Sequence, residues 1–172
     1  MSHDIRAFNV KWLDRLIHGQ LSPGLVNGVP PVGVDLNKEA VSEIACRMTS
    51  TFAKLALPVE EIRHALSKDD YASPQDTHSL QAVSLIQEWL SIARLKSKDV
   101  LGGHYPSLLQ MHLVWEDVSF FAGLSNADIC RIAIRLGSSN RFVLGWAWPN
   151  FLGSAGNVHP NLYQSYAFAL TA

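Results

Sequence analysis

Apolar residues recur every three or four positions along most of the chain, which is the spacing of one face of an amphipathic helix. In the stretch after Thr77, for example, Val83, Ile86, Trp89 and Leu90 fall on one such face. The spacing predicts helices over residues 4–20, 35–55, 59–67, 77–98, 107–121 and 125–136. Because helices account for most of the sequence, the expected fold class is mainly α.

The expected helix at 125–136 carries recognisable signals at both ends. Ser125, followed three residues later by Asp128, resembles a capping box in which Asp replaces the usual Glu. Gly137 then follows the last apolar residue of the pattern and favours a helix end there.

Two other segments do not have helical spacing. Residues 21–34 are rich in Pro and Gly and predict an extended connector. Residues 142–148 alternate between large apolar side chains and others, which is the period of a β-strand. The large positions are Phe142, Leu144, Trp146 and Trp148. Since this is the one good strand candidate in the pattern, its sheet has to be completed by another chain or by connector residues 26–34.

We therefore expect a single domain over residues 1–172, a multi-helix domain with a short β segment near the C-terminus that dimerisation could complete. Its parts are an N-terminal helix (1–20), the Pro/Gly connector (21–34), a helical core (35–122) and a C-terminal part (123–172) with a helix, the strand and an uncharged tail.

Charge is scarce in this chain, at 17% of residues, and the shortage is local. All 14 Lys and Arg and all 15 Asp and Glu residues precede residue 142. The uncharged remainder holds several aromatic residues, which are enriched in protein interfaces. One interpretation is that this part belongs to the chain's own core. The other is an oligomer interface, with candidate residues Phe142, Leu144, Trp146, Trp148 and Phe151.

The sequence lacks the signals of several protein classes. No apolar run approaches the ~20 residues that span a bilayer, and the start does not read as a signal peptide. Cys46 and Cys130 form no CxxC pattern, so reduced thiols in a cytoplasmic protein are expected. The histidines have no zinc-ligand spacing and no catalytic motif is present, so we expect no metal, no cofactor and no enzymatic activity.

Residues 123–148 read GLSNADICRIAIRLGSSNRFVLGWAW. This segment resembles part of the FlhD-type subunits of bacterial transcription activators, in which a Leu–Ser or Leu–Thr step caps a short helix of apolar and basic residues. A Ser–Asn or Thr–Asn step then leads into an alternating aromatic and basic segment. Here Leu124–Ser125 corresponds to the cap and Ser139–Asn140 to the second step.

The resemblance implies a mainly helical, DNA-associated activator subunit that works in a heteromeric complex with a zinc-binding FlhC-like partner. Longer relatives of the family are encoded on conjugative plasmids and other mobile genetic elements. A homodimer or higher oligomer agrees with the aromatic strand. The candidate DNA-contacting residues are Arg131, Arg135, Asn140 and Arg141, because the first two lie four apart on one helical face and the others follow at the turn.

Two other functions remain open from the residues alone. The chain could be a structural or adaptor protein of a conjugation or secretion system that binds protein only, through the same aromatic part. It could also be a small enzyme of unrecognised type, if a pocket gathers His104, His112 or Glu116.

Overall fold

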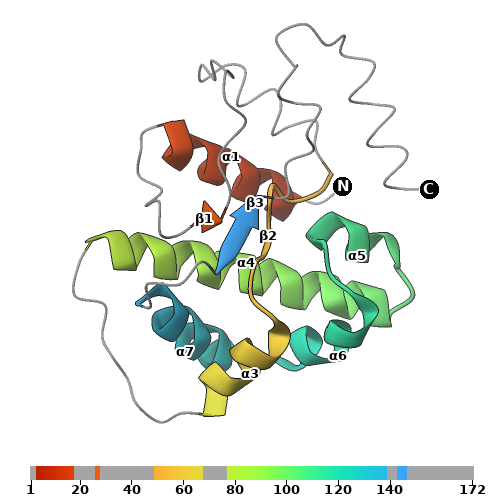
Figure 1. Cartoon of the computed structure of the whole chain (residues 1–172). Coiled ribbons are helices and arrows are strands. Elements are labelled where there is room, and N and C mark those ends of the chain that lie inside the picture. Colours follow the sequence, from red (N-terminus) through yellow and green to blue (C-terminus); the bar gives the residue numbers. More distant parts are fainter. Residues whose placement is uncertain (1–2, 18–25, 28–48, 68–76, 139–142, 147–172) are drawn as a thin grey trace, which may run out of the picture.

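The structure is a computed structural model that describes residues 3–17, 26–27, 49–67, 77–138 and 143–146. A long helix, α4 (Thr77–Leu101), runs through its middle (Figure 1). Along the chain the other elements are α1 (His3–Ile17), β1 (Val26–Asn27), β2 (Ala53–Leu55), α3 (Val59–Ser67), α5 (Pro106–Met111), α6 (Trp115–Gly123), α7 (Asn126–Gly137) and β3 (Leu144–Trp146). The described part is mainly helical, as expected.

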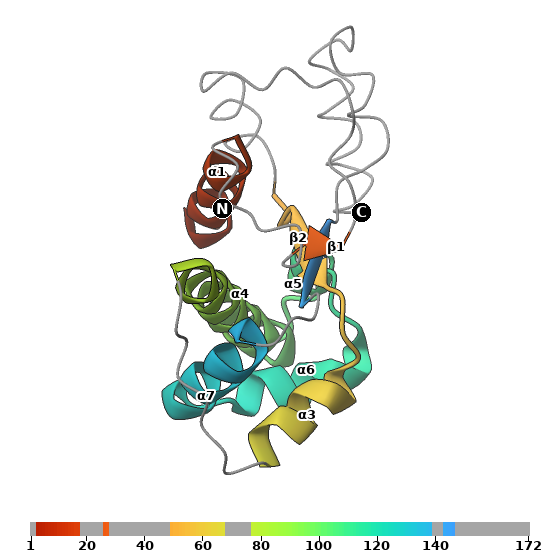
Figure 2. The same cartoon turned by 60° about the vertical axis from the view of Figure 1, so that its left-hand side comes forward.

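Helix α4 separates two groups of elements. Helix α1 and the small sheet lie on one side of it, and α3, α6 and α7 lie on the other (Figures 1 and 2). Burial explains this arrangement, because α4 has apolar residues on more than one face: Leu85, Ile86, Trp89, Leu90 and Ala93 are all at most 1% exposed. Each leucine or isoleucine in this set contributes roughly 1.5–3 kcal/mol when its side chain leaves water.

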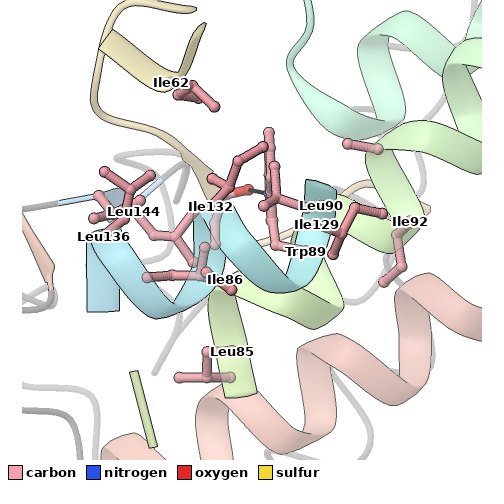
Figure 3. Packing of buried hydrophobic residues seen from close by; sticks show 14 of the residues in the cluster. Ile62, Leu85, Ile86, Trp89, Leu90, Ile92, Ile129, Ile132, Leu136 and Leu144 are labelled. Carbon is pink, nitrogen blue, oxygen red and sulfur yellow. Dashed lines mark hydrogen bonds between the residues drawn. The ribbon is translucent and has the colours of Figure 1, made fainter. Parts of the chain in front are cut away.

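The core is continuous across these layers. In Figure 3, Ile129, Ile132 and Leu136 of α7 face residues of α4, and Leu144 of β3 joins them. Phe121 of α6 packs edge-on against Trp89, with ring centroids 5.9 Å apart. A single cluster therefore ties helices α4, α6 and α7 to the sheet.

Strand β3 is the middle strand of a three-stranded sheet with the order β1-β3-β2. It pairs in parallel with β1, with Val26 opposite Leu144, and antiparallel with β2, with Lys54 opposite Gly145. Of the two expected ways to complete the sheet, the described residues contain pairing with the connector. The sheet therefore forms within one chain and does not need dimerisation to complete it. The expectation that β3 pairs with a strand of a second chain is corrected.

The helix predicted over 35–55 is wrong at its end. Residues Ala53–Leu55 form strand β2, whose backbone binds other parts of the chain. The buried amide of Asn9 on α1 accepts from Phe52 N–H at 2.9 Å and donates to the Ser50 carbonyl at 2.8 Å. These long-range partners outweigh the helical spacing, because a buried backbone group must be paired somewhere. Residues 35–48 lie outside the described part.

The helix predicted over 107–121 is divided into α5 and α6. His112 adopts a left-handed conformation (φ 54°), and its backbone N–H points back to the carbonyls of Leu108 and Leu109. Val114 is extended before α6 begins. The chain therefore turns between the two helices, and apolar spacing alone cannot register such a turn.

Three of the predicted helices are confirmed, and parts of two other predicted segments lie outside the described residues. Helices at 59–67 and 77–98 are confirmed by α3 and α4, and the helix at 125–136 by α7. No helix of the described residues is long and apolar enough to cross a membrane. Residues 28–34 of the connector and 147–172 of the tail lie outside the described part.

The close approach of α7 to α4 depends on Gly137. A Cβ atom built on Gly137 would lie 2.6 Å from Val83 Cγ2 and 2.8 Å from the Val83 backbone nitrogen. We expect Gly137→Ala to lower the free energy of unfolding by about 1–3 kcal/mol, because backbone atoms cannot move aside cheaply. Urea unfolding measures this change.

Gly123→Ala is the matched control. Gly123 ends α6, and a Cβ atom there meets nothing within 4 Å. Alanine should leave stability unchanged or raise it by up to about 1 kcal/mol, since it favours helix more than glycine does. Equal losses for both variants would contradict the tight α4–α7 contact.

Candidate functional site

Helix α7 begins with the predicted capping box. The Ser125 hydroxyl accepts from the backbone N–H of Asp128 at 3.1 Å, and the Asp128 carboxylate accepts from the Ser125 backbone N–H at 2.9 Å. The Ser125 side chain and backbone hydrogen bonds, and then the charge of Arg131, hold the pKa of Asp128 below its ordinary value. The capping box is confirmed, and it fixes where α7 starts.

Arg135 points toward α3 and is half-buried. Its guanidinium donates a hydrogen bond to the backbone carbonyl of Ala65, in the last turn of α3. A cation that binds a carbonyl at a helix C-terminus also interacts favourably with the helix dipole. Arg135 therefore joins α7 to α3, a contact that sequence spacing did not reveal.

Arg94 has a similar structural role on α4. Its guanidinium donates to the Asn126 side-chain oxygen at 2.7 Å and to the Leu124 carbonyl at 3.3 Å. These atoms flank the N-terminus of α7, so Arg94 holds the junction of α6 and α7 against α4.

Arg131 is half-buried on α7, one turn after Asp128. Of the four candidate DNA-contacting residues, only Arg131 and Arg135 are described, and they lie on one helix as expected. Asn140 and Arg141 lie outside the described residues. The structure thus brings together half of the predicted set, with Arg135 engaged by Ala65.

The candidate interface residues have different positions. Leu144 is fully buried in the core of its own chain. Trp146 lies at the end of β3, where its backbone pairs with Ala53. Phe142, Trp148 and Phe151 lie outside the described residues.

An exposed apolar surface lies at the junction of α4, α5 and α6, and sequence analysis missed it. We call it the α5 patch; its side chains are 47–60% exposed. It consists of Leu101, Tyr105, Leu109, Val114 and Trp115. The rings of Tyr105 and Trp115 are in contact, with centroids 6.0 Å apart. The sequence placed Trp115 inside one continuous helix, whereas the turn at His112 brings it to the surface.

Three residues are candidates for an enzyme site: His104, His112 and Glu116. The two histidines bind different partners. The His104 ring shares a hydrogen bond with the buried Ser107 hydroxyl at 2.9 Å, and the His112 ring binds the Thr51 carbonyl at 2.9 Å. Glu116 is exposed on α6. These contacts hold turns together.

Asp117, next to Glu116, has a pKa that its surroundings raise. Burial is the main cause that raises the pKa of Asp117, Glu60 and Glu116 raise it further, and Arg63 opposes them. Arg63 itself lies over the Phe120 ring, 5.0 Å from its centroid. Asp117 is therefore part of the α3–α6 contact.

The capping box predicts a defined loss of stability. We expect Ser125→Ala to lower the free energy of unfolding by about 1 kcal/mol, because the Asp128 backbone N–H loses its acceptor. Ser119→Ala, at an exposed position within α6, serves as the control and should cost nothing. Chemical denaturation of both variants measures the difference, and equal stability of Ser125→Ala and wild type would show that the box contributes nothing.

The surroundings of His112 predict that the stability of the fold depends on pH. Loss of water around its ring is the main cause that lowers the pKa of His112, and Lys54 lowers it further, whereas the Thr51 hydrogen bond opposes both. The unfolded chain then binds the proton more readily. The contribution of His112 to stability is therefore complete above about pH 6.5 and declines as the pH falls through its lower folded value.

We expect His112→Asn, which tolerates the left-handed backbone, to lose less stability than wild type between pH 7 and pH 5. Urea unfolding at both pH values gives the two differences. If they are equal, the neutral form of His112 is not favoured by the fold.

Among the described residues no group of three or more His, Cys, Asp or Glu side chains could hold a metal ion. No protein-family model matches the chain, and neither a curated protein nor a solved structure does. The functional interpretation therefore depends on the residues and their geometry.

Proposed function

We propose that this protein is a non-enzymatic subunit of a bacterial transcription activator, similar to FlhD-type subunits, and that it associates with DNA in the cytoplasm as part of a heteromeric complex. The observation that carries this proposal is the local structure of residues 123–138 and 143–146. Ser125 caps α7 through Asp128, and β3 follows after the Ser139–Asn140 step. This is the order of cap, helix and aromatic segment on which the resemblance depends.

In this proposal the arginines of α7 divide their roles. Arg135 positions α7 by its hydrogen bond to Ala65 on α3. The residues proposed to contact phosphates or bases are Arg131, Asn140 and Arg141, and Arg131 also interacts electrostatically with the Asp128 carboxylate. Contacts with phosphates orient a protein on DNA and carry little sequence information by themselves.

Under this proposal, the partner subunit supplies the DNA contacts and the metal that this chain lacks. The chain has a net charge of -1, so it offers few basic residues for bulk attraction to DNA. A zinc-binding FlhC-like partner would contribute the remaining DNA contacts and the metal. The chain itself would act as a homodimer or higher oligomer in that complex.

The test is a gel-shift titration of this chain co-expressed with a zinc-binding FlhC-like partner. We expect Arg131→Gln to weaken binding by roughly tenfold and to lower the salt slope by about 1, as loss of one phosphate contact does. Lys98→Gln, at an exposed position near the end of α4, removes the same charge elsewhere and should leave binding unchanged. Equal binding by the two variants would show that the basic face is assigned wrongly.

A second candidate is an adaptor protein that binds protein only. It is favoured by the guanidinium groups of Arg94 and Arg135, which are engaged within the chain and so are less available to phosphates. In the same titration, a complex that forms with its partner but shifts no DNA at any salt concentration would favour the adaptor over the activator.

A further inference from the structure

We draw no further inference here: the strongest candidate, the exposed aromatic surface patch where the ring of Tyr105, just before α5, contacts the ring of Trp115 at the start of α6, carries nothing, because nothing in the described residues shows what covers it.

Discussion

The carbonyl of Ala53 is the point at which the sheet and the helices are joined. It is buried, and it accepts hydrogen bonds from the Trp89 indole N–H at 3.0 Å and from the Thr51 hydroxyl at 2.8 Å. Leaving such a group unpaired would cost about 1–3 kcal/mol. Because Trp89 is central in α4 and Ala53 lies opposite Trp146, this contact places β2 and β3 on α4. The positions of α1, through Asn9, and of α5, through Thr51, follow from it.

The same constraint explains which features could be predicted from the sequence. Helices α3, α4 and α7 were predictable because their periodicity and the Ser125–Asp128 box are local signals. Strand β2 was not, since Phe52 and Leu55 also fit helical spacing. What decides their conformation is the pairing of backbone groups with Asn9 and Trp89, which are distant in sequence.

The candidate site was predictable to a similar extent. The sequence placed Arg131 and Arg135 four residues apart on one helix, and α7 contains both residues. That Arg135 binds the Ala65 carbonyl depends on the packing of α3 against α7, for which no local signal exists. The α5 patch escaped prediction because His112 turns the backbone, and a positive φ at a non-glycine residue leaves no trace in apolar spacing.

The central claim is that β3, which lacks an evident partner in the sequence pattern, is paired inside its own chain. The most direct measurement is isotope-filtered NMR on a sample refolded from equal amounts of labelled and unlabelled protein. We predict that cross-strand contacts between Lys54 and Gly145 appear in uniformly labelled protein and are absent from the spectrum that selects contacts between chains. Their appearance in that spectrum would show that the sheet is formed by two chains and would contradict the account.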